Sequence, residues 1–526
     1  MPSVDLSALQ APAAAEVPIG DLPAYHAARD AQRPALTQDG VTISWNDLEA
    51  RANRRARMFA ARGVGEGDFV TIALPNGLEF YETSFAIWKL GAIPNVVSSR
   101  LPDVETSFAI WKLGAIPNVV SSRLPDVELR AIVELARPSL VVGPDPARLP
   151  GWNVLPAGQA PDAALSAAAL PAKVAPYWKA MTSGGSTGRP KIIVDHKPAA
   201  WDPTIGALGM QPGDVLLNPG PLYHNAPFSL MHAGLFVGGH VVNMSRFDPL
   251  QALELIARHR VQWVNFVPTM MHRIWRLPEV ERTAFDLGSL RVVFHMASAC
   301  PLWLKEQWIA WLGPERIFEL YGGTERQGAT VISGTEWLAH KGSVGRILPG
   351  AQLRVVDEQG RNCAPGQVGE IFFLPEGGRN STYHYVGADS KAMGDWESIG
   401  DLGYLDADDY LYIVDRRTDM IVSGGANVYP AEVEAALDAH PDVGSSVVIG
   451  LPDDDLGHRV HALVQLAPAA RGRIDDDALR AYLETRLVRY KVPRSFEFVD
   501  DFLRDDAGKV RRTALRDARM ENSSPR

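Results

Sequence analysis

Residues 181–191 read MTSGGSTGRPK and stand directly before the strand-like Ile192-Ile193-Val194. Three glycines in this stretch let the backbone turn its N–H groups inward, the Ser and Thr hydroxyls add donors, and Lys191 adds positive charge. Together these features predict a loop that binds a polyphosphate. A flexible linker is the alternative, but linkers rarely combine several hydroxyls with a fixed Pro-Lys ending. The Walker A pattern G-x-x-x-x-G-K-[ST] is not matched, so a phosphate loop of another kind is predicted.

The sequence upstream of this loop alternates between strand and helix patterns. Residues 44–47, Ser-Trp-Asn-Asp, are typical of a capping box and predict a helix that runs towards Gly63, followed by a strand over residues 69–74. Strand, helix and strand repeated in this way indicate an α/β fold with a largely parallel sheet. At 526 residues, the chain is long enough for about three typical domains.

The composition narrows the class of protein. Hydrophobic residues make up 46% and charged residues 22%, as in an ordinary globular protein. The net charge of −10 argues against a protein whose main partner is nucleic acid or an anionic membrane. Two cysteines, Cys300 and Cys363, are too few for a disulfide framework or a thiolate zinc site. With no signal-peptide pattern and no apolar run of about 18 residues, we expect a cytoplasmic protein without a membrane span.

Residues 82–104, ETSFAIWKLGAIPNVVSSRLPDV, are repeated without any difference as residues 105–127. Each copy predicts an amphipathic helix with Phe, Ile, Trp and Leu on its apolar face, then a Gly-Ala turn and a short strand. Two copies do not make a solenoid, and a recent in-frame duplication or a sequence assembly artefact explains them better than a function. Because a close-packed core offers one complementary set of contacts, we expect one copy to dock and the other to form an extra piece at the surface.

The loop at residues 182–191 resembles the T-S-G-[ST]-T-G-x-P-K loop of the ANL superfamily of adenylate-forming enzymes, with one extra small residue. That superfamily includes acyl-CoA synthetases, adenylation domains and luciferases. Further matching segments follow in the order of the family, and they are residues 221–225 (PLYHN), 298–301 (SACP), 321–325 (YGGTE), 398–404 (SIGDLGY), 415–421 (DRRTDMI), 423–430 (SGGANVYP) and 505–512 (DDAGKVRR). The resemblance implies a large N-terminal domain of stacked α/β subdomains, residues 1–416, and a small mobile C-terminal α/β domain, residues 417–526.

The YGGTE segment has a chemical reason for each residue type. The Tyr321 ring can stack on adenine, the glycines admit a substrate close to the backbone, the Thr324 hydroxyl can reach the α-phosphate, and the Glu325 carboxylate can hold Mg²⁺. By the resemblance, Asp401 accepts hydrogen bonds from the ribose hydroxyls. The nucleotide-binding residues implied by the resemblance are Thr182, Ser183, Gly184, Gly185, Ser186, Thr187, Gly188, Lys191, Ser298, Ala299, Cys300, Tyr321, Gly322, Asp401 and Arg416.

The same resemblance assigns the remaining functional residues. Lys509 would reach the reacting carboxylate and the α-phosphate, and it is expected to be catalytic together with Thr324, Glu325 and His224, which guards the acyl tunnel. Cys300 is expected to be a packed small residue, not a nucleophile. Thr418 stands where the family commonly has Asp or Lys, so the hinge is assigned only to residues 415–421. The loop that binds CoA is expected at Gly424 and Gly425, and the acyl pocket at His224, Asn225, Phe228, Met271 and Gly323.

The activity that the resemblance implies is ATP-dependent conversion of a carboxylic acid to acyl-AMP, followed by transfer of the acyl group to CoA. The partners would be small molecules, namely the acid, ATP with Mg²⁺, and CoA. The chain could also form a homodimer. Residues 224–228 lack the Asp that holds the α-amino group in amino-acid-activating relatives, so an uncharged acyl group is favoured. Residues 219–228 (PGPLYHNAPF) with the segment from Val267 resemble ligases of bulky alicyclic, steroid-like or terpenoid acids.

Three alternatives stay open at this point. The chain could be a stand-alone adenylation enzyme that loads a carrier protein, or a ligase of medium- or long-chain fatty acids. It could also be a catalytically silent nucleotide-binding protein of the same fold. Loss of Lys509 or Glu325 would have favoured the silent protein, but both residues are present.

Overall fold

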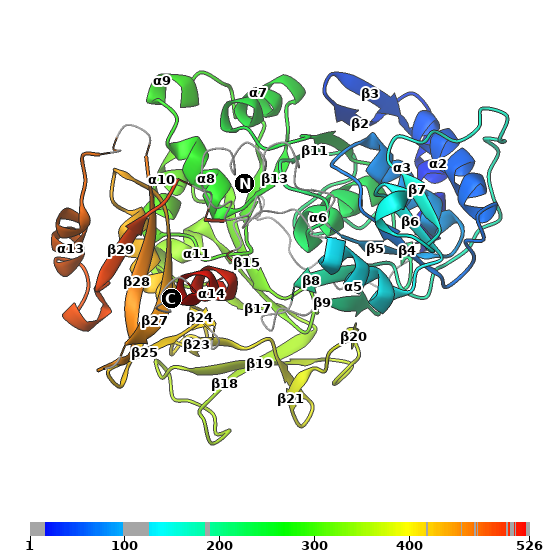
Figure 1. Ribbon diagram of the computed structural model, residues 1–526. Coiled ribbons are helices and arrows are strands. Elements are labelled where there is room, and N and C mark those ends of the chain that lie inside the picture. Colours follow the sequence, from blue (N-terminus) through cyan, green and yellow to red (C-terminus); the bar gives the residue numbers. More distant parts are fainter. Residues whose placement is uncertain are drawn as a thin grey trace.

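The computed structural model describes residues 16–97, 126–184, 190–416, 419–453, 455–467, 470, 472–500, 503–504, 510 and 512–521. The N-terminal elements lie at one end of the molecule and the C-terminal elements at the other (Figure 1).

A seven-stranded sheet carries the two ends of the predicted phosphate loop. Its order is β20 (Tyr383–Val386), β9 (Pro190–Asp195), β8 (Ala180–Gly184), β5 (Ile93–Val96), β4 (Phe69–Ile72), β6 (Leu140–Gly143) and β7 (Val154–Pro156). The strands from β8 to β7 run parallel, and β9 and β20 add antiparallel pairs at one edge. Helices α2 (Trp45–Ala60), α3 (Leu78–Lys89) and α5 (Asp126–Ala136) belong to this part of the chain.

The predicted capping box at the start of α2 is confirmed. The Ser44 hydroxyl accepts a hydrogen bond from the Asp47 backbone N–H at 3.1 Å, and the Asp47 carboxylate accepts one from the Ser44 backbone N–H at 3.2 Å. These two bonds satisfy donors that the first turn of a helix leaves free. The local sequence therefore fixes where this helix begins.

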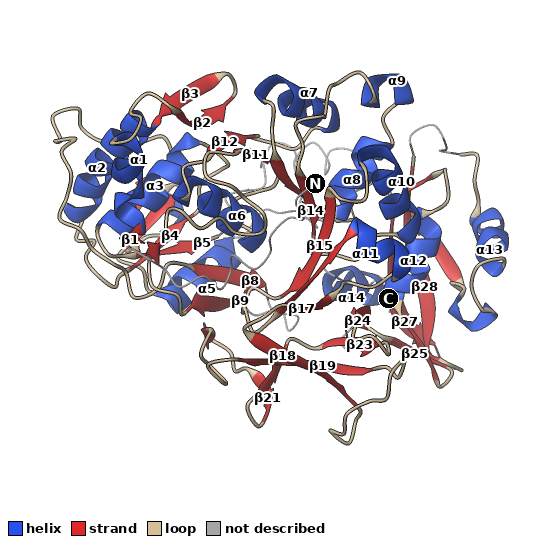
Figure 2. Cartoon of the chain, turned by 180° about the vertical axis from the view of Figure 1, so that it is seen from behind, coloured by secondary structure: helices blue, strands red, loops and turns tan. Residues whose placement is uncertain are grey.

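A nine-stranded sheet forms the second layer. Its order is β17 (Arg346–Ile347), β16 (Ala329–Ser333), β15 (Ile317–Gly322), β14 (Val292–His295), β13 (Trp263–Phe266), β11 (Val215–Asn218), β12 (His240–Asn243), β2 (Pro34–Gln38) and β3 (Val41–Ser44). The strands from β15 to β2 are parallel. Figure 2 shows α3 and α6 (Asn225–Phe236) between the two large sheets. The rings of Trp88 and Phe228 pack together there, so one aromatic core joins both sheets.

Shorter elements complete this body. The other helices are α1 (Leu22–Ala27), α7 (Pro249–His259), α8 (Pro268–Trp275), α9 (Glu279–Arg282), α10 (Leu302–Leu312) and α11 (Gly334–Ala339), with strands β1 (Val17–Pro18) and β10 (Ala200–Trp201) forming a small antiparallel pair.

A third sheet departs from the largely parallel arrangement that the sequence predicted. It contains β21 (Lys391–Met393), β22 (Trp396–Ser398), β19 (Gly369–Pro375), β23 (Asp401–Leu405) and β24 (Leu411–Arg416), with β18 (Ala351–Val356) also paired to β19. Every pair in it is antiparallel. Short turns join β21 to β22 and β23 to β24, and a turn of this length produces an antiparallel pair. The prediction of a parallel sheet was thus wrong for this segment.

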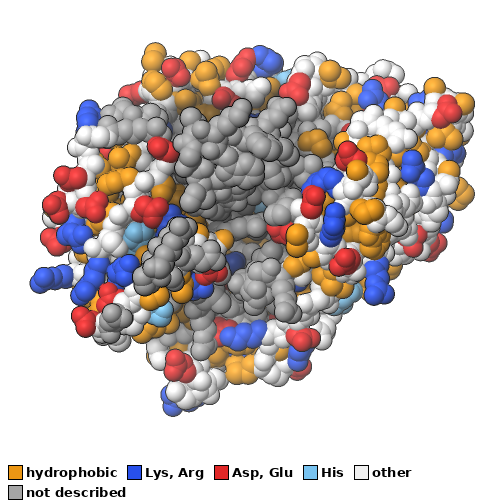
Figure 3. All heavy atoms as spheres, viewed as in Figure 1, with side chains coloured by type: hydrophobic (Ala, Val, Ile, Leu, Met, Phe, Trp, Pro, Cys, Tyr) orange, Lys and Arg blue, Asp and Glu red, His pale blue; other side chains and the backbone are white. Residues whose placement is uncertain are grey.

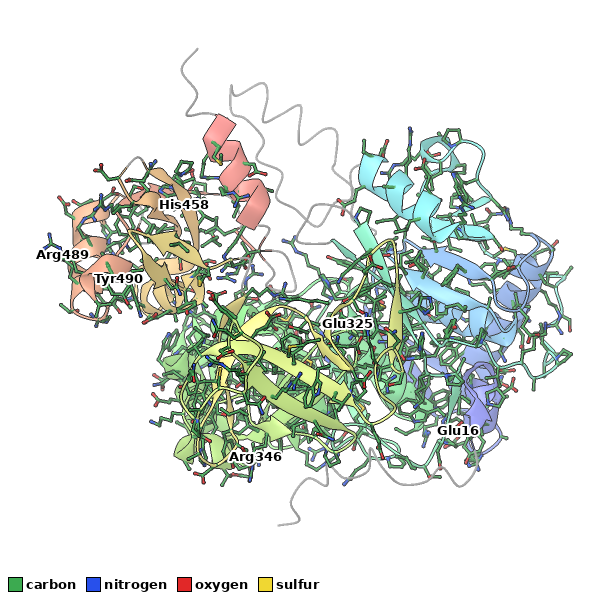
Figure 4. The ribbon with its side chains drawn as sticks, turned by 90° about the horizontal axis from the view of Figure 1, so that it is seen from below. Glu16, Glu325, Arg346, His458, Arg489 and Tyr490 are labelled. Carbon is green, nitrogen blue, oxygen red and sulfur yellow. The ribbon has the colours of Figure 1, made fainter. Side chains whose placement is uncertain are left out.

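The elements after residue 420 form a smaller α/β unit. They are β25 (Ile421–Ser423), β26 (Ala426–Val428), α12 (Pro430–Asp438), β27 (Val443–Asp453), β28 (Gly457–Leu466), α13 (Asp476–Glu484), β29 (Ser495–Phe498) and α14 (Arg512–Glu521). Val433, Leu437, Val460 and Leu483 belong to a core of this unit alone. Figure 4 shows the unit in orange and red at one side of the body. The predicted large N-terminal and small C-terminal α/β domains are confirmed, whereas residues 417 and 418, where the predicted boundary falls, lie outside the described residues.

One arginine links the two parts. Arg276, directly after α8, donates hydrogen bonds to the backbone carbonyls of His440 (3.3 Å), Pro441 and Val443 (2.7 Å). These carbonyls follow the C-terminal end of α12, where the helix dipole is negative and favours a cation.

The first copy of the repeated segment supplies α3 and β5. Phe85, Ile87 and Trp88 are fully buried and Leu90 is 6% exposed, which confirms that one copy docks with its apolar face in the core. The first turn of α3 comes from residues 78–81, before the repeat begins. Helix α5 starts with the last two residues of the second copy. The rest of that copy, and its predicted surface position, lie outside the described residues.

The surface carries mixed charge. On the face in Figure 3, basic and acidic side chains are interspersed over the coloured parts, among hydrophobic side chains. In the part of the chain that the structure describes, no helix has both the length and the apolar character needed to cross a membrane.

Candidate active site

A cavity of about 2680 Å³ gathers most of the residues that the sequence singled out. The predicted residues along its wall are Thr182, Lys191, His224, Asn225, Ser298, Ala299, Cys300, Tyr321, Gly322, Gly323, Thr324, Glu325, Asp401 and Arg416. The smaller C-terminal unit also contributes to the wall, through Glu432, Arg504 and Arg512. The cavity therefore has walls from both parts of the chain.

The two ends of the predicted phosphate loop are held side by side by strand pairing. Ser183 is paired with Lys191 and Gly184 with Pro190 across the antiparallel strands β8 and β9, and residues 185–189 between them lie outside the described residues. The Thr182 hydroxyl donates to Asn95 Oδ1 at 3.2 Å. Because both ends belong to the central sheet, the start and finish of the loop are fixed in position.

Glu325 lies beside this loop although it is far away in the sequence. Its side chain is buried, and Figure 4 shows it near the middle of the molecule. Its Oε1 accepts a hydrogen bond from the Tyr385 hydroxyl at 2.7 Å and lies 3.5 Å from Lys191 Nζ. Burial lowers the pKa of Lys191, and the charge of Glu325 opposes that shift. The pair places a positive and a negative group on one side of the cavity.

Tyr321, Asp401 and Arg416 form a second polar group. The Tyr321 hydroxyl donates to Asp401 Oδ2 at 2.8 Å, and Arg416 Nε lies 3.3 Å from Asp401 Oδ1. Asp401 is opposite Arg416 in the register of β23 and β24, so the antiparallel sheet brings them together. Burial raises the pKa of Asp401, and the Arg416 guanidinium acts in the opposite direction. The arrangement is a buried hydrogen-bond acceptor beside an aromatic ring.

The turn at residues 298–300 faces the same cavity. Ala297, just before it, has φ of 78°, a left-handed conformation that is uncommon for a residue with a side chain. Burial and the nearby Glu319 raise the pKa of the Cys300 thiol. A thiol held in its protonated form is a poor nucleophile, in line with the expected packing role.

Two of the five predicted acyl-pocket residues do not line the cavity. Phe228 is fully buried and faces the aromatic core between the sheets, where its ring packs against Trp88 and His232. Met271 is fully buried in the core that contains Trp308. A sequence motif locates a helix turn but does not say which face of the helix points toward the cavity and which toward the core. The structure therefore does not support the assignment of these two side chains to the acyl pocket.

Several predicted site residues are not gathered by the described structure. Gly424 and Gly425 form the turn between β25 and β26, with φ of 56° and 80°, and they are not part of the cavity wall. Such positive φ values suit glycine. Gly185, Ser186, Thr187, Gly188 and Lys509 lie outside the described residues.

Sequence reasoning missed a buried lysine in the cavity wall. Lys179, just before β8, is 1% exposed, and its Nζ donates to Ser229 Oγ at 2.9 Å and to Asn225 Oδ1. Both partners lie on the first turns of α6. The one signal available in the sequence was a lysine inside the otherwise apolar approach to the phosphate loop.

A divalent cation has no preformed cage here. Among the described residues no group of three or more His, Cys, Asp or Glu side chains is placed to hold a metal ion. No described residue donates a hydrogen bond to Glu325 Oε2, since both contacts of its carboxylate use Oε1. One free carboxylate oxygen suits a Mg²⁺ ion whose other ligands are phosphates and water.

Comparison with known proteins adds independent information. The family model described as "AMP-binding enzyme" matches residues 24–376, and the model "AMP-binding enzyme C-terminal domain" matches residues 432–509. A feruloyl-CoA synthase from Amycolatopsis sp is 32% identical over 518 residues, which cover 95% of this chain and 98% of that protein. A 2-succinylbenzoate–CoA ligase from Geobacillus kaustophilus is 31% identical over 92% of this chain and 96% of its own.

A solved structure is also similar over nearly the whole chain. The o-succinylbenzoate CoA synthetase from Bacillus subtilis, in complex with its acyl-adenylate intermediate, superposes with a TM-score of 0.73 at 25% sequence identity. The match covers 97% of this chain and 99% of that one.

Proposed function

The chain belongs to the family of AMP-binding enzymes, and on that premise we propose that it activates a carboxylic acid as acyl-AMP and then transfers the acyl group to CoA. The observation that carries the proposal is the single cavity in which Lys191, Glu325, Tyr321, Asp401 and Arg416 meet. Glu325 lies in the turn after β15 and the other four residues lie in strands of three sheets, and a merely structural role would not require them to face one space.

The nucleotide is held at two places in this proposal. Residues 182–191 surround the phosphates with backbone N–H groups and hydroxyls, and Lys191 neutralises part of their charge. Asp401 accepts hydrogen bonds from the ribose hydroxyls, and the positive charge of Arg416 opposes the rise in the pKa of that carboxyl which burial causes. The Tyr321 ring and the turn at 298–300 lie against the adenine.

Glu325 Oε2 is the oxygen that would ligate Mg²⁺ on the phosphates. The bound ion would supply positive charge to the phosphate oxygens. The other carboxylate oxygen is held by the Tyr385 hydroxyl at 2.7 Å, so the side chain is oriented before any substrate arrives.

The first reaction brings anions together, and charge neutralisation is therefore its main requirement. An oxygen of the substrate carboxylate attacks the α-phosphorus of ATP, the bond to the bridging oxygen breaks, and pyrophosphate leaves. Acyl-AMP remains, with AMP as a good leaving group. We assign Lys509 to the carboxylate and the α-phosphate, where one such preorganised donor is worth about 2.7–4 kcal/mol of transition-state stabilisation.

The second reaction, formation of the thioester with CoA, requires a different part of the C-terminal domain at the active site. In the proposal, residues 417–526 rotate about the segment 415–421, Lys509 leaves the site, and the turn at Gly424 and Gly425 takes its place beside the CoA tunnel. The CoA thiolate then attacks the acyl carbonyl carbon, and AMP departs. No covalent enzyme intermediate is needed.

The acyl group is proposed to contain a ring. The cavity wall on the side of α6 includes the large rings of Trp178, Trp201 and Tyr223, which favour a flat or bulky apolar body. The sequence motif around residues 219–228 favours alicyclic or terpenoid acids, whereas the two named relatives carry aromatic acids in their names. Aromatic and alicyclic acids are therefore the two classes of substrate that an activity assay should compare.

The test is incubation with ATP, Mg²⁺, CoA and a panel of carboxylic acids, with detection of acyl-AMP and acyl-CoA by mass spectrometry. Formation of an acyl-CoA from at least one ring-containing acid is expected. Accumulation of acyl-AMP that only a carrier protein can discharge would favour the loading enzyme instead. Absence of both products across the panel would refute the proposal and leave a nucleotide-binding protein.

A further inference from the structure

Two lysines stand in the wall of the cavity beside α6. Lys179 precedes β8 and Lys197 follows β9, and both contribute to the cavity wall. The backbone holds the two segments together, because Asp195 N–H donates to the Lys179 carbonyl at 3.1 Å and Trp178 N–H to the Lys197 carbonyl at 2.9 Å. The two ammonium groups therefore belong to one region of the wall.

Their surroundings leave positive charge uncompensated. Asp195 is the nearest acid, with Oδ2 at 3.7 Å from Lys179 Nζ, but its Oδ1 already accepts from Arg326 at 2.6 Å. Lys197 Nζ lies over the Trp201 ring at 3.6 Å from its centre. Within the described residues no carboxylate is at ion-pair distance from Lys197, and only the exposed Glu16 acts on it as a further acid. Three cations thus face one buried carboxylate.

The pKa values of both lysines lie below the ordinary value for a lysine side chain. Burial lowers the pKa of Lys179 to about 8, with Asp195 opposing the shift. Burial also lowers the pKa of Lys197 to about 8, and the charge of Arg326 lowers it further. Lys179 is buried and shares Asp195 with Arg326, and the half-buried Lys197 has no described carboxylate at ion-pair distance. Excess positive charge in a partly desolvated wall is unfavourable, so a bound anion would stabilise both ammonium groups.

On the basis of the proposed function, we infer that the acyl pocket selects a carboxylic acid with a second anionic group, a carboxylate or a sulfonate, and that Lys179 and Lys197 bind it. An extended chain rises about 3.3 Å per residue, which puts the backbone of Lys179 roughly 10 Å from Thr182. The second group would therefore lie at the end of the acyl moiety that is remote from the reacting carboxylate.

Two further features of the wall fit this ligand. Asn225 and Ser229 hold Lys179 Nζ by two hydrogen bonds, so the ammonium group is already oriented and one of its N–H groups is left over. Helix α6 has no side chain capping its first turn, and the free N–H groups there add positive potential. A neutral acyl group would instead bury apolar atoms against two ammonium groups, which revises the expectation of an uncharged acyl group.

The experiment compares matched acids on one skeleton: a phenylalkanoic acid, the same acid with a second carboxylate at the far ring position, and the same acid with a sulfonate there. The wild-type enzyme is expected to show a kcat/KM at least about tenfold higher for one or both dianions in acyl-CoA formation. Lys197→Met should remove this preference, because it lowers the kcat/KM for the dianions far more than the kcat/KM for the monoacid. Lys197→Arg should retain it, and Lys179→Met should act as Lys197→Met does.

Controls separate this inference from the proposed function. Lys173→Met removes a half-buried lysine that is not part of the cavity wall, and it should leave the preference unchanged. The KM for ATP should be the same in all variants. Turnover of the monoacid with refusal of both dianions overturns the inference alone, whereas lack of any acyl-CoA from any acid refutes the proposed function. A preference that survives Lys197→Met and Lys179→Met also overturns the inference.

Discussion

The repeated segment allows one stability prediction to be made with an internal control. Trp88 and Trp111 occupy the same place in the two identical copies, and we expect a close-packed core to accept only one of them. We predict that Trp88→Ala destabilises the protein strongly and that Trp111→Ala leaves it nearly unchanged.

The size of the effect follows from the surroundings of Trp88. The side chain is fully buried, and its indole N–H donates to the Trp178 carbonyl at 2.7 Å. Burying such a ring removes about 150–250 Å² from water, which corresponds to about 4–6 kcal/mol at about 25 cal/mol per Å². The methyl group that Ala retains reduces this to about 3–5 kcal/mol. The orphaned Trp178 carbonyl adds about 1 kcal/mol. For Trp111→Ala we expect a change within about 0.5 kcal/mol.

Urea-induced unfolding followed by far-UV circular dichroism measures both changes without depending on tryptophan fluorescence. If Trp88→Ala fails to fold, the pair Ile87→Val and Ile110→Val tests the same point, because Ile87 is fully buried and its truncation should cost about 0.5–1.5 kcal/mol. Equal losses at the two members of either pair would refute the reasoning, since both copies would then be packed.

Four further outcomes are expected. Deletion of residues 105–127 should preserve adenylation and preserve or raise the melting temperature; a clear fall in either would show that both copies are integral. Lys509→Ala should abolish acyl-AMP formation but spare conversion of supplied acyl-AMP to acyl-CoA, and equal loss in the two assays would contradict its assigned role. Asp401→Asn should raise the KM for ATP about tenfold or more, as loss of a charged hydrogen-bond acceptor predicts, while the KM for the acid stays constant; an unchanged KM for ATP would count against ribose binding. Arg276→Ala should accelerate proteolysis within residues 415–421 several-fold, because three hydrogen bonds between the two parts are lost; an unchanged rate would mean that this arginine does not hold the domains together.

Local signals in the sequence predicted local structure well. The capping box at Ser44 and Asp47 depends on neighbouring residues, and it begins a helix where expected. The antiparallel third sheet was missed because its pairing, for example that of Asp401 with Arg416, is decided by turns and register that a strand pattern does not contain.

In the candidate site, too, some residues could be predicted from the sequence and others could not. Residues inside a motif, such as Tyr321 and Glu325, were found by their order and chemistry, and the fold brings them to one cavity. Lys179 was missed because its partners on α6 are 46 and 50 residues further along the chain. Phe228 was misassigned because a motif does not state which side of a helix faces the core.

The mixed origin of the cavity wall has a consequence for inhibition. Tyr321 belongs to the large domain and Arg504 to the small one, and both border the same space. A compound that contacts both residues would bind the two domains at once and stabilise the relative position that they have in this structure. In the proposed mechanism, such a compound would block turnover by preventing the domain rotation, and raising the concentration of the carboxylic acid would not overcome it if the acyl pocket were left empty. Inhibitors could therefore be sought at the boundary between the two domains, beside the proposed adenine position.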